Sequence, residues 1–127
     1  MPRHQYRIYG DDLAQSWCIV DEQDYQACVR HRWGWKASRG EVKKYLFRNR
    51  HVNWANGGEA RLNRTQENLF LHTYILEELM GVPRPTPKHI VDHRNGNHHD
   101  CRRKNLRWAT VIQNRRNRNG VHARDTF

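Results

Sequence analysis

Cysteine is scarce in this chain, and its spacing excludes two classes of small protein. The three cysteines, Cys18, Cys28 and Cys101, are an odd number, and none belongs to a Cys-x-x-Cys pair. A disulfide framework and a zinc finger are therefore both unexpected.

Long apolar runs are missing as well. Apolar residues make up 36% of the 127 residues, and no run approaches the roughly 20 residues that cross a bilayer. The first five residues do not resemble a secretory signal. We therefore expect a cytoplasmic protein without a membrane partner, a monomer or weak dimer, built as one small domain or as one compact domain with extensions.

Acidic residues are few and unevenly distributed. The chain carries 23 Lys and Arg against 13 Asp and Glu, a formal net charge of +10. Residues 84–127 hold 11 of the basic residues but only 3 of the acidic ones. Such dense positive charge favours a polyanionic partner, and nucleic acid is the commonest one. A solvated basic tail is the alternative, but Trp, Leu and Ile between the arginines argue against disorder.

The first quarter of the chain predicts a strand followed by a helix. Residues 16–20 form a short apolar run with Trp and Ile, which is typical of a strand. Asp21 stands where a capping side chain would open a helix over residues 22–31. Tyr25, Cys28 and Val29 are spaced to give that helix an apolar face.

The next segments predict a hairpin and a loop. Residues 33–36 and 42–48 flank a turn-like Ser-Arg-Gly triplet, which indicates a β-hairpin. Residues 49–66 are polar and include Asn-Gly-Gly, so we expect a loop there.

The strongest helical pattern in the chain runs from Leu69 to Met80. It ends at Gly81, a residue that favours a helix C-terminus. Three prolines between residues 83 and 87 then predict an extended connector. His72 lies in this helix, and we expect it to pack there.

The last third predicts two short strands and a helix. Residues 89–93 and 106–109 are expected strands on either side of a polar loop. Thr110 and Gln113 match a capping box that opens a final helix, and Asn114 lies in its first turn.

Asp92 and His93 are the residues in this region best suited to catalysis. A carboxylate at a strand end suits Mg²⁺ or Mn²⁺, and a neighbouring imidazole is a natural general base. Side chains next to each other on a regular strand point to opposite faces. We therefore expect a bend or bulge at Asp92-His93, helped by Gly96 three residues on.

Two asparagines stand at suggestive distances from this pair. Asn105 falls in the loop before the second strand, where its amide could tie the loop to the backbone and hold His93 in place. Asn114 lies near a helix N-terminus, where its amide oxygen could complete the metal ligands. Each of these residues alone would be an ordinary turn, cap or surface residue. His98 and His99 are expected to be exposed, and we assign them no role.

The same residues resemble HNH endonucleases of the phage and intron-homing type. The resemblance covers roughly residues 17–118 and departs from the family at Thr73, where Arg is usual, and at Cys101, where Asn is frequent. It is carried by Leu71-His72, Val91-Asp92-His93-x-Asn95-Gly96-Asn97, Asp100-x-Arg102-Arg103-x-Asn105-Leu106-Arg107-Trp108-Ala109-Thr110 and Gln113-Asn114, with Ile19-Val20-Asp21-Glu22-x-Asp24-Tyr25 and Trp33 upstream.

The resemblance implies an α+β fold with a ββα-metal (His-Me finger) core that binds one Mg²⁺ or Mn²⁺ ion. Asp92 and Asn114 match the metal ligands, His93 the general base and Asn105 the structural asparagine of the motif. The implied activity is hydrolysis of DNA phosphodiester bonds, by nicking or double-strand cleavage, to 5′-phosphate and 3′-hydroxyl ends. A phage-encoded protein would act in the bacterial host cytoplasm.

We expect three regions in the chain. Residues 1–66 form a strand-helix-hairpin extension and loop that contact DNA, residues 67–118 form the nuclease core, and residues 119–127 form a flexible tail. Basic side chains on the hairpin and around the motif are expected to bind double-stranded DNA, mainly at its phosphates. These expected contacts are Arg39, Lys43, Lys44, Arg48, Arg50, Arg102, Arg103, Arg107, Arg115, Arg116 and Arg118.

Two other functions remain open at this point. The first is a non-catalytic DNA-binding or packaging accessory protein that keeps the fold, although binding alone does not need the Asp-His-Asn-Asn set. The second is a nonspecific, toxin-like nuclease acting on DNA or RNA.

Overall fold

The computed structural model describes residues 5–11, 16–37, 43–52 and 65–118. Helices and strands are mixed along these residues, in agreement with the expected α+β class. The elements are β1 (Tyr6–Tyr9), β2 (Trp17–Val20), α1 (Glu22–Val29), β3 (Gly34–Ala37), β4 (Lys44–Val52), β5 (Thr65–Phe70), α3 (Leu71–Thr73), η1 (Tyr74–Leu79), β6 (Ile90–His93), η2 (Arg103–Asn105), β7 (Leu106–Ala109) and α4 (Val111–Arg118).

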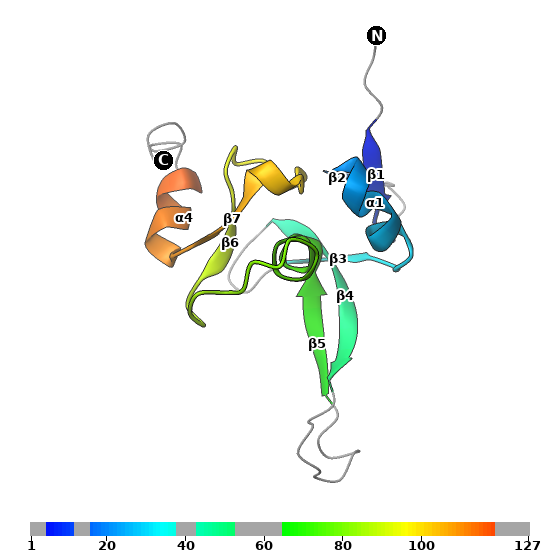
Figure 1. The fold of residues 1–127 in the computed structure, drawn as a ribbon, viewed down its shortest axis with the longest axis horizontal. Coiled ribbons are helices and arrows are strands. Elements are labelled where there is room, and N and C mark those ends of the chain that lie inside the picture. Colours follow the sequence, from blue (N-terminus) through cyan, green and yellow to red (C-terminus); the bar gives the residue numbers. More distant parts are fainter. Residues whose placement is uncertain (1–4, 12–15, 38–42, 53–64, 119–127) are drawn as a thin grey trace.

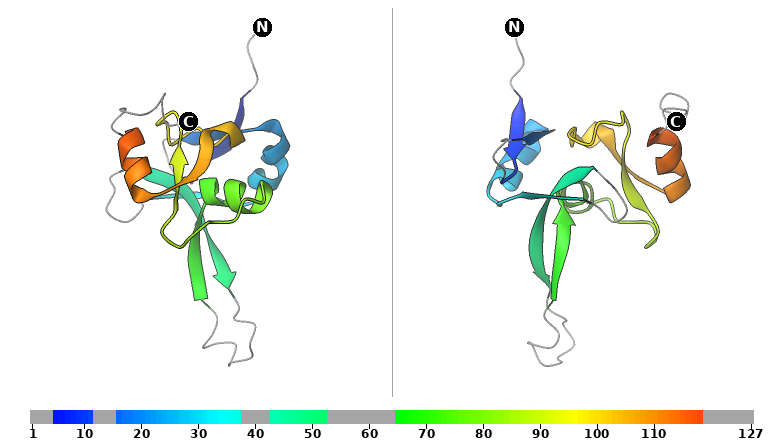
Figure 2. Two further views of the ribbon diagram at one scale, coloured as in Figure 1. Left: turned by 60° about the vertical axis from the view of Figure 1, so that its left-hand side comes forward. Right: turned by 180° about the vertical axis from the view of Figure 1, so that it is seen from behind.

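The described strands form three small antiparallel sheets, ordered β1-β2, β3-β4-β5 and β6-β7. Figure 1 shows β6, β7 and α4 on one side of the molecule and β1, β2 and α1 on the other. The helix formed by α3 and η1 is seen end-on between them, and β4 and β5 project away as a two-stranded arm (Figures 1 and 2).

This arm is longer than the sequence pattern predicts. Part of the loop expected over residues 49–66 is strand, because β4 continues to Val52 and pairs there with Thr65. Arg50 lies opposite Glu67 in this register, and opposite charges across two strands stabilise the pair. The sequence pattern predicted a loop because these residues are mostly polar, but they form a strand whose partners in β5 are polar as well. Residues 53–64 lie outside the described part of the chain.

The central helix begins later than expected. Leu69 and Phe70 belong to β5, where they pair with Arg48 and Phe47, so helical structure starts at Leu71. From Tyr74 to Leu79 the helix is π-helical. It ends as predicted before Gly81, whose φ of 71° is a left-handed conformation that glycine adopts without strain.

Helix α1 starts where predicted, but its cap differs. Asp21 occupies the N-cap position without a side-chain cap bond. Its carboxylate instead accepts the backbone N–H of Arg103 at 2.8 Å. On the face turned inward Asp24 is 1% exposed, whereas Val29 at the end of the helix is 46% exposed. The buried face of α1 is thus partly polar, and it serves a contact with the distant η2 segment.

One hydrophobic core joins the N-terminal elements to the rest of the described chain. Trp33 and Leu46 from the first half pack in the same cluster as Ile75 and Leu106 from the second half. The core thus crosses the expected boundary between residues 66 and 67. Backbone pairing crosses it too, because Ile19 donates to the His99 carbonyl at 2.8 Å and accepts from the Cys101 N–H at 2.9 Å.

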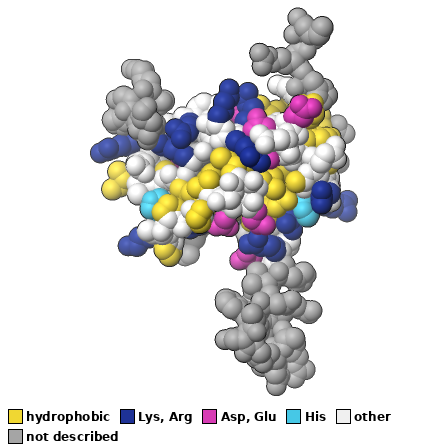
Figure 3. Space-filling view, in the orientation of Figure 1, with side chains coloured by type: hydrophobic (Ala, Val, Ile, Leu, Met, Phe, Trp, Pro, Cys, Tyr) yellow, Lys and Arg dark blue, Asp and Glu magenta, His cyan; other side chains and the backbone are white. Residues whose placement is uncertain are grey.

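The surface around this core is strongly basic. On the face seen in Figure 3, Lys and Arg side chains surround a central band of hydrophobic side chains. Within the described residues, the helices are too short or too polar to cross a membrane.

Candidate active site

Strands β6 and β7 pair regularly through the Asp92-His93 step. Asp92 lies opposite Arg107 and His93 opposite Leu106. The bend or bulge expected at this step is therefore wrong. The chain turns after His93 instead, where Gly96 donates to the His93 carbonyl at 2.8 Å and adopts a φ of 78°. Because the strand ends at His93, one pocket can be lined by both side chains.

Asn105 ties down the loop between the two strands, as predicted. Its side-chain oxygen accepts the Asn95 N–H at 2.9 Å, and its amide nitrogen donates to the Asp100 carbonyl at 2.8 Å. Its own carbonyl accepts the Arg94 N–H at 2.8 Å. Asn105 is buried, so these three bonds satisfy a side chain and backbone that water cannot reach. They fix the residues that directly follow His93.

A second buried side chain, Asp100, strengthens the same loop. Its carboxylate accepts the Asn95 amide at 3.0 Å and two nitrogens of Arg102 at 2.8 and 2.7 Å. Burial alone would raise the pKa of Asp100, but the hydrogen bonds and charge of Arg102 hold it below its usual value. The loop thus has a charged anchor that remains ionised.

The capping box predicted at the start of α4 is present. The Thr110 N–H donates to the Gln113 side-chain oxygen at 2.9 Å, and the Gln113 N–H donates to the Thr110 hydroxyl at 3.2 Å. This fixes where the helix begins. Asn114 and Asn117, one turn apart, both line the same pocket as Asp92.

Asp92 is buried and firmly held. It is 1% exposed, and it accepts hydrogen bonds from Arg107 Nε at 2.8 Å and from the Asn117 amide at 3.0 and 3.1 Å. The same amide nitrogen donates to the His93 carbonyl at 2.8 Å. Asn117 therefore clamps both residues of the pair to α4. The sequence interpretation missed it, although its spacing of three from Asn114 places both on one helix face.

His93 has a ring nitrogen that is available for chemistry. The residue is 8% exposed, and within the described structure its Nε2 is buried without a hydrogen-bond partner. Burial is the main cause that lowers the pKa of His93 to about 4; the positive charges of His98 and Lys43 contribute to this shift, and Asp100 opposes it. The imidazole is therefore neutral at pH 7, the state in which a histidine can accept a proton.

Aromatic rings surround His93 and fix its position. The Tyr45 ring stacks on it with centroids 6.2 Å apart, and the His72 ring meets it edge-on at 5.1 Å. His72 itself stacks on Phe70 at 5.4 Å, and burial holds the pKa of His72 well below its ordinary value. The packing expected for His72 is thus present, but this residue also lines the pocket. His98, which was expected to be exposed and without a role, is partly buried and lines the pocket as well.

These residues enclose a pocket of about 420 Å³. Asp92 is its one acidic lining residue among the described side chains, and its permanent cations are Lys43 and Arg84. Asp92 is already paired with Arg107, so the remaining charge in the pocket is positive. The described lining consists of Lys43, Tyr45, Asn68, Phe70, His72, Thr73, Arg84, Ile90, Val91, Asp92, His93, Gly96, His98, Asn114 and Asn117.

Four of the expected DNA contacts have carboxylate partners within the protein. A phosphate contact by any of them would compete with that ion pair. For Arg102, Arg103 and Arg107 it would leave a buried carboxylate without its partner. The pairs are Arg50 with Glu67 and Glu78, Arg102 with Asp100, Arg103 with Asp24, and Arg107 with Asp92.

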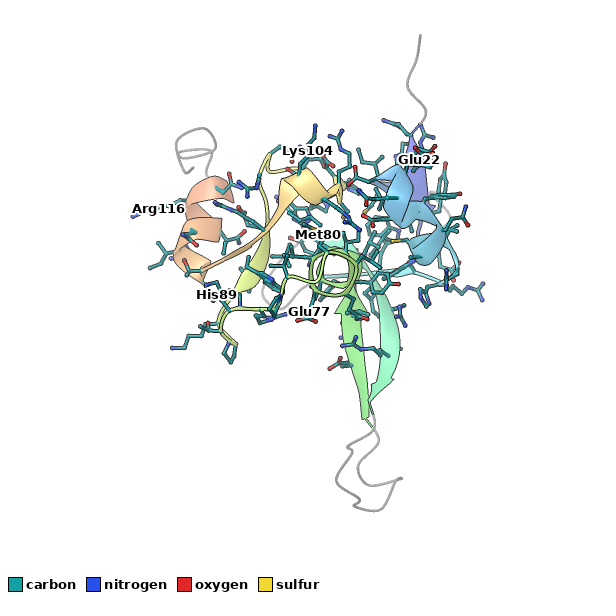
Figure 4. The ribbon with its side chains drawn as sticks, in the orientation of Figure 1. Glu22, Glu77, Met80, His89, Lys104 and Arg116 are labelled. Atoms are coloured by element: carbon teal, nitrogen blue, oxygen red, sulfur yellow. The ribbon has the colours of Figure 1, made fainter. Side chains whose placement is uncertain are left out.

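The other expected DNA contacts differ in exposure. Arg48 is half-buried over the rings of Trp33 and Tyr74. Arg39 lies outside the described residues. Arg118 is the last residue of α4, and its side chain is not among those described. Figure 4 shows Arg116 pointing away from α4. The exposed members of the set are Lys43, Lys44, Arg115 and Arg116.

The side chains at the pocket suit a hard cation with few protein ligands. In the described part of the chain, no three His, Cys, Asp or Glu side chains converge to hold a metal ion. The Asp92 carboxylate accepts three hydrogen bonds out of about four that it can accept, so one ligand direction remains. Asn114, whose side chain carries an amide oxygen, also lines the pocket. This donor set fits Mg²⁺ or Mn²⁺, which keep several water ligands.

Comparison with known proteins places this region in one family. The family model described as HNH endonuclease matches residues 69–116. No curated protein and no solved structure matches the chain. The match spans β5 through α4 and so contains Asp92, His93, Asn105 and Asn114. Residues 69–116 of the chain therefore match an HNH endonuclease domain.

Proposed function

We propose that the protein is a divalent-metal-dependent endonuclease that hydrolyses phosphodiester bonds in double-stranded DNA, by nicking or double-strand cleavage. The observation that supports this most directly is the pairing of two buried groups at one pocket. One is the carboxylate of Asp92, and the other is the neutral His93 ring with an unpartnered Nε2. A protein that only binds DNA has no need for a buried proton acceptor.

His93 is the proposed general base. Its Nε2 takes a proton from a water molecule as the water oxygen bonds to phosphorus and the bond to the 3′ oxygen breaks. The products are a 5′-phosphate and a 3′-hydroxyl, whose oxygen takes its proton from solvent. Asn105 and Asn117 act through His93, the first by fixing the loop after it and the second by holding its carbonyl.

Asp92 and Asn114 are the proposed metal ligands, with Mg²⁺ or Mn²⁺ as the ion. Bound there, one cation supplies charge neutralisation for the transition state and for the leaving oxygen. Arg107 and Asn117 orient the Asp92 carboxylate toward this task, because both donate to it from β7 and α4. Such outer partners keep a ligand in the geometry that the metal requires.

Exposed basic side chains are the proposed contacts to the DNA backbone. Lys43 lies just before β4 and Lys44 begins it, and Arg115 and Arg116 lie on α4, so these exposed cations come from two separate parts of the chain. Because phosphate contacts position a duplex without reading its sequence, we expect loose sequence preference. We further propose a phage or mobile-element role in a bacterial host cytoplasm, and a monomer or weak dimer.

A plasmid-nicking assay tests this proposal. Supercoiled plasmid incubated with the protein and Mg²⁺ or Mn²⁺ should convert to nicked circles, and EDTA should stop the conversion. Plasmid that is bound but stays supercoiled under all metals would instead indicate the non-catalytic accessory role. Equal digestion of matched RNA would indicate the nonspecific nuclease.

A further inference from the structure

Arg84 lies in the proline-rich connector before β6 and was not among the expected DNA contacts. It lines the same pocket as Asp92 and His93. Lys43, the other permanent cation of the lining, comes from the start of β4. Both charges act on histidines of the pocket. The pKa of His72 is lowered mainly by burial, then by neighbouring histidines, and also by Arg84. The pKa of His93 is lowered mainly by burial, and Lys43 contributes to that shift. The pocket therefore has a positive field from two separate segments.

The Arg84 guanidinium is held in place from two directions. Its Nη1 donates to the His89 carbonyl at 2.9 Å, and its central carbon lies 4.6 Å from the centre of the Trp108 ring. Trp108 in turn donates to the Val82 carbonyl at 2.8 Å, which fixes the connector to β7. Figure 4 shows His89 beside the start of β6, on the same side of the molecule as α4. An arginine positioned in this way loses little freedom when it binds an anion.

We propose that Arg84 binds a non-bridging oxygen of the phosphate that is cleaved. This inference rests on the proposed nuclease function. An arginine has five N–H donors, and one of those of Arg84 is used by the His89 carbonyl. The others can donate to phosphate oxygens in the geometry that arginine favours. The negative charge that develops on these oxygens in the transition state would strengthen the same bonds.

Arg84 is itself exposed, but it lines the pocket, so its proposed role differs from that of basic side chains that contact DNA outside the pocket. A backbone contact outside the pocket affects how tightly the duplex binds, whereas a contact to the cleaved phosphate affects the rate of the chemical step. The expected signature of Arg84→Gln is therefore a lower rate at saturating protein with little change in affinity. Lys88 provides a matched control, because it is exposed on the same connector and does not line the pocket.

The test compares wild type, Arg84→Gln, Arg84→Lys and Lys88→Gln in two assays. Single-turnover nicking of plasmid is measured with Mg²⁺ at saturating protein, and plasmid affinity is measured in EDTA. Arg84→Gln should nick about tenfold to a hundredfold more slowly than wild type, with affinity within about threefold. Arg84→Lys should recover part of the rate, because it restores the charge. Lys88→Gln should nick at the wild-type rate.

The outcomes separate this inference from the proposed function. A wild-type protein that never nicks contradicts the proposed function itself. An active wild type together with an Arg84→Gln rate within twofold of it overturns the phosphate contact. An Arg84→Lys variant that is as slow as Arg84→Gln, with both melting at lower temperature than wild type, also overturns it, since packing on Trp108 would then be the role of Arg84.

Discussion

Two regions of the molecule each contain an ion pair between a buried aspartate and an arginine, but the surroundings of the two pairs differ. At the junction of α1 and η2, Asp24 is 1% exposed and binds Arg103 at 2.6 Å. At the pocket, Asp92 is 1% exposed and binds Arg107 at 2.8 Å. The two carboxylates are equally buried, although the Arg103 side chain is 30% exposed and the Arg107 side chain 9%.

The difference lies in what surrounds each pair. Asp24 accepts hydrogen bonds from Arg103 on both carboxylate oxygens, and together they join two distant elements. Asp92 faces a pocket that also contains the unpartnered Nε2 of His93. A buried aspartate–arginine pair alone therefore does not mark an active site. What distinguishes the Asp92 pair is the unpartnered His93 Nε2 that lines the same pocket.

Replacing His93 by alanine should give the largest effect. Cleavage should fall by about 10²–10⁴-fold, because the proton acceptor is lost. Binding to DNA in EDTA should remain near the wild-type level, since the exposed cations are unchanged. Nicking rates and electrophoretic mobility shifts measure the two quantities. Equal losses of binding and cleavage would contradict the base assignment.

Asp24→Ala should test the structural pair. Removing this carboxylate leaves Arg103, whose side chain is 30% exposed, without its anion, so unfolding free energy should fall by about 3 kcal/mol. Asp11→Ala is the control, since its pair with Arg32 is mostly exposed and should contribute little. Urea denaturation compares them. Similar losses for both variants would show that burial of the Asp24 pair is not what matters.

Asp92→Asn should lower the affinity of the protein for metal ions, whereas a change in the Asp24–Arg103 pair should not. The amide keeps an oxygen for Arg107 but loses the negative charge, so affinity for Mn²⁺ should fall by at least about tenfold. Titration calorimetry on the free protein measures this, with the Asp24→Ala protein as the comparison if it remains folded. Unchanged Mn²⁺ affinity in Asp92→Asn would remove this residue from the ligand set.

Acid should destabilise the pocket through His93. Because burial lowers its pKa from 6.5 to about 4 in the folded state, the unfolded chain binds this proton more readily. Stability is thus unaffected well above pH 6.5 and is lost as the pH falls from 6.5 toward 4, by about 2 kcal/mol between pH 7 and pH 5. Denaturation in EDTA should show a smaller loss over this range for His93→Ala than for wild type. Equal losses of stability in the two proteins would show that His93 is not the group responsible for the acid sensitivity.

Arg116→Ala should give the smallest effect. Arg116 is exposed on α4, so its removal should weaken DNA binding modestly and reduce the salt dependence of log K by about one unit. The nicking rate at saturating protein should stay unchanged. A slower chemical step in this variant would place Arg116 at the pocket rather than on the backbone.

Sequence predicted the features that depend on neighbours along the chain. The capping box of Thr110 and Gln113 and the stop at Gly81 appear as expected, because each is set by a few adjacent residues. The strand through Asp92 and the loop tie of Asn105 followed from spacing. Local chemistry, in short, could be read directly.

The rest depends on contacts between distant residues. The clamp from Asn117 to Asp92 requires that α4 packs on β6, which no local pattern specifies. The polar residues after Arg48 form a strand because their partners lie in β5. The arginines in the densely basic last third of the chain were all expected to contact DNA. Arg103, however, binds the buried Asp24, which lies 79 residues earlier.

The backbone bonds between Ile19 and the His99–Cys101 segment have a consequence for folding kinetics. They join residues about 80 positions apart, and closing a loop of that length must precede the contacts that stabilise it. A chain that has not yet been extended to residue 101 can pair β2 with β1, but it lacks the Cys101 N–H that donates to Ile19. The loop that follows His93 should therefore be anchored to β2 late, which keeps the pocket incomplete in a partly synthesised chain.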